Sequence, residues 1–108
     1  MSDQWTVAIR DEFGRVLCVE PNGQGVVEFR EAAGAWETVT LTKHGPNQYS
    51  ALFREAKRFL CVTDTGALET REQRGAWETF RVTEQPPDWQ PIFLFRDGAF
   101  RALTVDVL

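Results

Sequence analysis

The sequence Gly34-Ala35-Trp36-Glu37-Thr38 occurs twice in this chain, because residues 75–79 repeat it without change. Five identical residues around a tryptophan, starting at positions 34 and 75 of a 108-residue chain, indicate an internal duplication. Working outward from the two boxes, residues 15–19 align with 58–62 and residues 28–31 align with 69–72. The chain is therefore expected to be built from structural repeats of about 40 residues.

Each repeat is expected to contain short β-strands, because apolar and polar residues alternate between turn-forming segments and no stretch shows helical periodicity. Repeat one covers about 5–42, repeat two about 49–83, and a partial third repeat about 91–108. The strands are expected at 5–10, 15–20, 26–31, 36–42, 49–54, 58–62, 67–72, 77–83, 92–97 and 99–106. The prediction is a single all-β domain spanning 1–108, with four strands in each full repeat and two in the third.

The duplicated tryptophans and cysteines are expected to have structural roles. Trp36 and Trp77 start equivalent strands, which favours burial as core or capping residues. Cys18 and Cys61 also occupy equivalent positions, in apolar runs. That placement favours buried free thiols over a disulfide.

Composition excludes several classes of partner. The formal net charge is −4, and an acidic chain without a basic stripe argues against nucleic acid and against an anionic membrane surface. No apolar run approaches the roughly 20 residues of a transmembrane helix. The first residues, 1–4, are polar and do not form a signal peptide, so the chain is expected in the cytoplasm or within a larger assembly.

Two to three units of four short strands favour a β-trefoil, with a truncated third repeat, over a propeller, which needs four or more blades. The segments 14–20 and 58–63, together with the two Trp-Glu-Thr boxes, resemble fascin-like β-trefoil repeats. The resemblance covers residues 5–83 well and 91–108 weakly. It implies a trefoil barrel that binds ligands in shallow pockets between strands. Fascin-like domains occur in actin bundlers, on bacterial secreted hydrolases and in virion proteins. Actin binding is disfavoured here, because the bundlers carry several trefoils.

The truncated third repeat raises the question of how its apolar residues are buried. Three alternatives stand: a barrel of ten strands closes by itself, the N-terminal segment covers the gap, or another chain completes it. The third alternative predicts self-association or a protein partner through the open edge and the apolar C-terminus. The surface expected for it consists of Phe93, Phe95, Phe100, Val107 and Leu108.

The sequence shows no constellation typical of an enzyme, so no catalytic residue, metal site or cofactor is predicted. His44 is the single histidine and lies in a Gly/Pro-containing segment, where an exposed side chain is expected. One histidine without a neighbouring ligand makes no zinc site. A dyad of His44 with Cys18 or Cys61 is conceivable, but both thiols lie in apolar runs that suit inert packing.

The function that remains is a non-catalytic binding module. One hypothesis is a carbohydrate or cell-surface ligand, recognised by an aromatic face and planar polar groups in loops. The alternative is a protein-interaction component of a larger assembly, such as a virion or a multi-protein complex. The candidate ligand-binding residues for the first hypothesis are Trp89, Asn22, Gln24, Asn47 and Tyr49.

Overall fold

The structure is a computed structural model. It describes residues 3–11, 13–21, 24–32, 34–45, 48–63, 67–73, 92–96 and 99–108, and for 62, 92–96 and 99–102 it describes the backbone. Within these ranges the chain is all-β apart from one 3-10 turn, η1 (Ala35–Glu37). The strands are β1 (Gln4–Arg10), β2 (Val16–Cys18), β3 (Glu28–Arg30), β4 (Val39–Gly45), β5 (Gln48–Phe53), β6 (Arg58–Val62), β7 (Leu68–Arg71), β8 (Ile92–Arg96) and β9 (Ala99–Val107).

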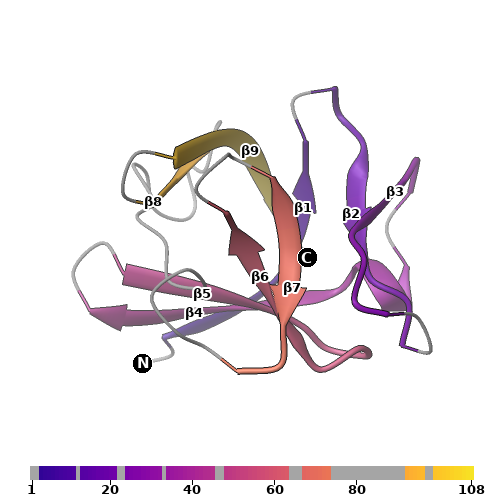
Figure 1. Ribbon diagram of the computed structural model, residues 1–108, viewed down its shortest axis with the longest axis horizontal. Helices are drawn as coiled ribbons and strands as arrows, with labels where there is room; N and C mark the ends of the chain where they lie inside the picture. The colour runs from indigo at the N-terminus through magenta and orange to yellow at the C-terminus, as the bar shows by residue number, and fades with distance from the viewer. Residues whose placement is uncertain are drawn as a thin grey trace.

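The all-β prediction is confirmed, and the strands pair as repeated units. Neighbours along the sheet run β3-β2-β1-β4-β5-β6-β7, all antiparallel, with β9 joined to both β1 and β8 (Figure 1). In unit one, β1 pairs with β2 and β4, and β2 pairs with β3. In unit two, β5 pairs with β6 and β6 pairs with β7 in the same way. The strand expected at 77–83, with its Trp77 box, lies outside the described residues.

The core lies between the strands that carry alternating apolar residues. Tyr49, Ala51 and Phe53 face it from β5, because every second residue of a strand points to the same side. Further core residues come from β1, β2, β4, β6 and β9 and the turn after β2: Val7, Ile9, Leu17, Val19, Val39, Leu41, Leu60, Leu103 and Val105. Cys18 and Cys61 are both buried and free, as expected.

The repeated box is not a strand at its start, which corrects the prediction for 36–42. Residues Ala35–Glu37 form η1, and the strand begins at Val39. Successive side chains of a 3-10 turn point in directions about a third of a turn apart. Glu37 therefore turns inward and is buried, whereas Trp36 is 43% exposed. The interpretation of Trp36 as a core residue was wrong for this reason.

The third unit is shorter than the others because one strand, β9, takes the places of both strand two and strand four. Its first part pairs with β8 through Phe95↔Phe100, as strand one pairs with strand two in unit two through Phe53↔Arg58. Its second part pairs with β1 through Ile9↔Val105, as β4 pairs with β5 through Val39↔Phe53. The position of strand four is thus filled, and what the third unit lacks is the hairpin that β2–β3 and β6–β7 form in the other units.

The β9–β1 pairing also bears on how the third unit's residues are covered. Four residue pairs, from Val7↔Val107 to Arg10↔Thr104, join the last strand to the first. Arg10 Nε donates to Asp106 Oδ2 at 2.6 Å across the same pair of strands. This edge of β9 is therefore occupied by the chain's own β1 and is no open edge for a second chain.

The hairpins of units one and two contact each other directly. The Gly25 carbonyl, in the turn between β2 and β3, accepts a hydrogen bond from the Thr70 hydroxyl of β7. A Cβ on Gly25 would lie 2.7 Å from Thr70 Oγ1 and 2.7 Å from Arg58 Cζ, and closer still to Arg58 Nε. Gly25 has φ +77°, which only glycine adopts without strain. The turn of one hairpin thus docks on the face of the next.

Candidate functional site

A fixed turn between β1 and β2 is organised around one buried carboxylate. Asp11 Oδ1 accepts hydrogen bonds from the backbone N–H of Phe13 at 3.0 Å and of Arg15 at 2.8 Å. Its Oδ2 accepts from Arg15 Nε at 2.9 Å, and Nη2 of the same guanidinium lies 2.8 Å away. Gly14, at φ +82°, completes the turn, and its carbonyl accepts from Arg10 Nη1 at 3.0 Å. The turn is therefore held by side chains as well as by backbone.

Arg15, fixed in this way, lies against two phenylalanine rings. Its Cζ is 5.5 Å from the centroid of the Phe13 ring and 4.4 Å from that of Phe29. Cation–π contacts of this kind contribute about 0.5–1 kcal/mol at exposed sites. Phe29 lies on β3 and packs partly against the core, while Phe13 lies on the turn. We call Asp11, Phe13, Arg15 and Phe29 the Arg15 aromatic site.

The site presents a large apolar group to solvent. Phe13 is 81% exposed, although its backbone and its neighbour Arg15 are held rigidly. Aromatic and arginine side chains are the types that dominate binding energy at protein interfaces, and rigid ones lose less entropy on binding. The arrangement therefore offers an apolar partner a turn whose backbone and Arg15 side chain are already held by hydrogen bonds.

The ionisation of Asp11 keeps the site in one charge state. Burial alone would raise the pKa of Asp11, but the hydrogen bonds from Arg15 and Phe13 and the Arg15 charge outweigh it and lower the pKa. Near neutral pH the carboxylate is therefore charged and neutralises Arg15. The site is then apolar with one internal ion pair.

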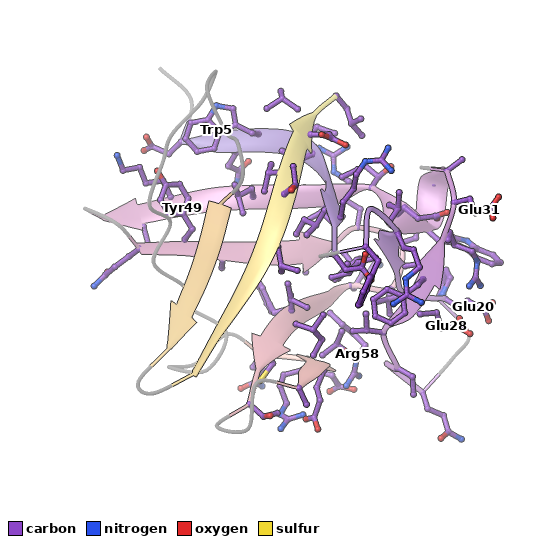
Figure 2. All side chains as sticks on the ribbon, turned by 90° about the horizontal axis from the view of Figure 1, so that it is seen from above. Trp5, Glu20, Glu28, Glu31, Tyr49 and Arg58 are labelled. Carbon is purple, nitrogen blue, oxygen red and sulfur yellow. The ribbon has the colours of Figure 1, made fainter. Side chains whose placement is uncertain are left out.

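An acidic group lies beside the site on the β2–β3 hairpin. Arg30 Nη2 lies 3.2 Å from Glu20 Oε1 and 3.3 Å from Glu28 Oε2, and Glu31 is exposed next to it. Figure 2 shows Glu20, Glu28 and Glu31 at one end of the molecule, with Trp5 and Tyr49 at the other. Two carboxylates paired with one guanidinium, and a third on the residue after Arg30, leave this end of the hairpin negative.

The ligand residues expected from the sequence do not form one cluster in the described part of the chain. Gln24 is exposed, next to the docked Gly25 turn. Tyr49, at the start of the strand expected at 49–54, was named as a candidate ligand-binding residue, and its burial contradicts that role. It lies in β5, is fully buried, and packs against Trp5 with 6.2 Å between ring centroids. Asn22, Asn47 and Trp89 lie outside the described residues.

The expected C-terminal interaction surface is described in part. Val107 and Leu108 have exposed side chains, and the Leu108 backbone N–H donates to the Thr6 carbonyl at 2.9 Å. Phe93 and Phe95 lie on β8 and Phe100 on β9. The side chains of these three lie outside the described residues.

The groups considered for chemistry lie in inert settings. His44 is exposed, as expected, but lies in β4 rather than in a loop, and its Nε2 is 2.7 Å from Ser50 Oγ. Ser50 is buried and faces no solvent. Burial, followed by the negative charge of Glu37, raises the pKa of Cys18 to about 11, so this thiol stays protonated. In the ranges that the structure covers, no group of His, Cys, Asp and Glu could hold a metal ion.

Sequence reasoning placed residues 11–14 in a turn and missed the site. The signal was a large apolar residue at a position where unit two has a small one. Gly14 and Lys57 both have positive φ and both precede the arginine that starts strand two, so Phe13 corresponds to Ala56. A phenylalanine before a turn glycine, replaced by alanine in the repeat, indicates a role specific to unit one.

Comparison with known proteins identifies the fold. A solved structure described as a designed 3-fold symmetric protein, ThreeFoil, matches with a TM-score of 0.65, covering 98% of this chain and 89% of that chain. The chain is a β-trefoil. The prediction of a trefoil with a truncated third repeat is confirmed. At 12% sequence identity the likeness shows the fold alone.

Other comparisons add no family. No family model matches the chain, and no curated protein matches it. The resemblance to fascin-like repeats therefore stays a prediction. Within the described ranges, no helix has the length and apolar character needed to cross a membrane.

Proposed function

We propose that this chain is a non-catalytic binding module whose partner is a protein, bound at the Arg15 aromatic site. The observation that carries the proposal is Phe13, which is 81% exposed on a turn fixed by the buried Asp11 carboxylate. A side chain this exposed buries little apolar surface in the monomer beyond its contact with the Arg15 guanidinium. Its burial against a partner would remove that apolar surface from water at small entropic cost.

The protein partner is preferred over the carbohydrate hypothesis because of the side chains that face solvent. The exposed large apolar residues include Phe13, Val26 and Trp36. Tyr49, one of the expected glycan-binding residues, has no exposed face. A place in a larger assembly is the setting that such a surface favours, and the resemblance to fascin-like repeats agrees with a binding or structural role.

The proposal of a non-catalytic role rests on the setting of each reactive group. Ser50 beside His44 is buried, and the raised pKa of Cys18 opposes a thiolate at neutral pH. Neither group offers a nucleophile that a substrate in solution could reach.

The test compares two exposed apolar positions. A phage-displayed library of linear peptides and a printed glycan array would be screened against the wild-type chain. Binding would then be measured for Phe13→Ala and for Leu108→Ala, which changes the C-terminal surface instead. Both residues are exposed, so both variants should keep the free energy of unfolding within about 0.5 kcal/mol of wild type.

The expected result is a set of peptides whose affinity falls at least about tenfold in Phe13→Ala, equivalent to about 1.4 kcal/mol. Leu108→Ala should bind them as wild type does. Peptides that depend on Leu108 instead would move the site to the C-terminal surface. Glycan binding that Phe13→Ala leaves intact would overturn the proposal and return the carbohydrate hypothesis to first place.

A further inference from the structure

The contact between units one and two shows how a trefoil hairpin is covered in this chain. The Gly25 turn of unit one lies on Arg58 and Thr70 of unit two. Arg58 Nε donates to Thr70 Oγ1 at 2.8 Å, and the same hydroxyl donates to the Gly25 carbonyl. The face formed by the start of β6 and the middle of β7 is therefore covered by the turn of the preceding unit's hairpin.

The equivalent face on unit one is the Arg15 aromatic site. Arg15 corresponds to Arg58, since each follows a positive-φ residue and leads into strand two. Phe29 corresponds to Thr70, because Leu17↔Phe29 and Leu60↔Thr70 are the same pair in the two hairpins. The hairpin turn of unit one covers this face on unit two. By the threefold arrangement of the trefoil, the hairpin turn of unit three would cover the same face on unit one. Unit three has no such hairpin, because β9 runs directly from its pairing with β8 to its pairing with β1.

The exposure of the two equivalent arginine side chains agrees with a face of unit one that no hairpin turn covers. The Arg15 side chain is 50% exposed, whereas Arg58, under the Gly25 turn, is 25% exposed. The chemistry of the two faces also differs. Thr70 and Ala56 in unit two are replaced by Phe29 and Phe13 in unit one, so the uncovered face is the more apolar of the two.

We propose that the Arg15 aromatic site is the vacant docking place of the third hairpin, and that the turn of a β-hairpin from a partner protein fills it. This inference rests on the proposed function and names the partner's shape and chemistry. In unit two the Thr70 hydroxyl donates to the carbonyl of the docked Gly25 turn, but in unit one Phe29 stands in the place of Thr70. The partner turn therefore meets two phenylalanine rings, Phe13 and Phe29, and carries an apolar residue against them.

The flanks of the partner turn are basic. Glu20, Glu28 and Glu31 lie on the same β2–β3 hairpin as Phe29 and carry more negative charge than Arg30 neutralises. Glu28 and Arg30 point to the opposite face of β3 from Phe29, so this charge acts on the approaching partner from the edge of the site. Lysine or arginine residues beside the apolar tip match this charge. A second copy of this chain cannot fill the site with its Gly25 turn, because that turn is already docked on unit two of its own chain.

The experiment uses a phage-displayed library of disulfide-closed hairpins with randomised turns, selected on the full chain. Selected hairpins would be synthesised, and their Kd measured by fluorescence anisotropy for wild type, Phe13→Ala and Leu108→Ala. A fourth protein carries a copy of residues 20–38 inserted between Thr104 and Val105, where β9 passes from β8 to β1. This insertion supplies the missing hairpin in cis.

The expected hairpins carry an apolar tip with basic flanks and bind more weakly as salt rises. Phe13→Ala and the insertion should each weaken binding at least about tenfold, equivalent to about 1.4 kcal/mol, while Leu108→Ala leaves it unchanged. If the insertion prevents folding, hydrogen exchange of the wild-type complex replaces it. Protection should then appear at 13–15 and 28–30.

The outcomes separate the inference from the proposed function. Hairpins that need Phe13 but bind the insertion protein undiminished, or that protect other amides, overturn the docking inference and leave the protein-binding function standing. The same holds if linear peptides need Phe13 and no hairpin does. Binding that is independent of Phe13 throughout overturns the proposed function itself.

Discussion

Replacing Gly25 by alanine should destabilise the chain by breaking the contact between its first two hairpins. Two costs add. The residue has φ +77°, a conformation that costs an L-residue about 1–2 kcal/mol. A Cβ would also lie 2.7 Å from both Arg58 Cζ and Thr70 Oγ1, so either the turn or these two side chains must shift.

A shift of the turn or of the Thr70 side chain disrupts the hydrogen bond from Thr70 to the Gly25 carbonyl, inside a buried region. Losing a buried hydrogen bond costs about 1–3 kcal/mol. Alanine offsets a fraction of this, roughly 0.4–1 kcal/mol, by restricting the unfolded chain. The free energy of unfolding should therefore fall by about 1–5 kcal/mol, a large share of the stability of a small domain.

The matched control is Gly14→Ala, since Gly14 has nearly the same φ, +82°, and a Cβ there meets nothing within 4 Å. It should carry the backbone cost alone, about 1 kcal/mol after the offset. Urea denaturation followed by tryptophan fluorescence measures both, and the m-value should stay constant. If Gly25→Ala costs no more than Gly14→Ala, the hairpin contact contributes nothing, and its use as a template for the vacant site fails.

Three further predictions follow from single residues. In the described ranges Lys57 is the non-glycine residue with a positive φ, 57°, which is a strained conformation for a residue with a side chain. Lys57→Gly should therefore raise the free energy of unfolding, measured by urea denaturation, by up to about 1 kcal/mol. A lower free energy of unfolding would contradict the idea that Lys57 is strained. Asp11→Asn should cost about 1–2 kcal/mol at neutral pH by removing the ion pair with Arg15, and unchanged stability would refute this role for Asp11. Because the folded pKa of Asp11 is lowered, its stabilisation exists above the unfolded pKa and fades as pH falls through the folded one, so wild type and variant should converge in acid. The pKa of Cys18 is raised from 9.0 to about 11, so the protonated thiol contributes its full stabilisation below pH 9.0, and the free energy of unfolding should fall as pH rises towards about 11. If Cys18→Ala loses stability in alkali in the same way as wild type, Cys18 is not the group responsible.

The sequence predicted the repeats, the strand content and the trefoil, because these follow from local patterns. Strands β1, β5 and β6 begin and end within about one residue of the expected positions, where alternation and turn residues are clear. The start of the repeated box was mispredicted. Trp36 and the residues after it alternate like a strand, but a 3-10 turn exposes Trp36 while burying Glu37 beside Cys18.

The candidate site depends on long-range features that local patterns do not carry. For example, β9 occupies the place of strand four because Val105 pairs with Ile9, and these two residues are far apart in the chain. Phe13 lies in a stretch correctly predicted as a turn, yet its exposure and its contact with Arg15 depend on how Asp11 folds back. The truncation of the third repeat was visible in the sequence. Recognising that it removes a hairpin, and which face this leaves uncovered, required the strand pairing and the register of unit two.

The pairing of β9 with β1 has a consequence for how the chain folds. Arg10 and Asp106, which are joined across these strands, are 96 residues apart. Closing so long a loop is entropically costly, and contacts of this separation slow folding. β1 can pair early with the nearby β2 and β4, but part of its edge waits for the last strand. An apolar strand edge stays unprotected until then, so we expect the rate of refolding, and its competition with aggregation, to depend on the pairing of β9 with β1.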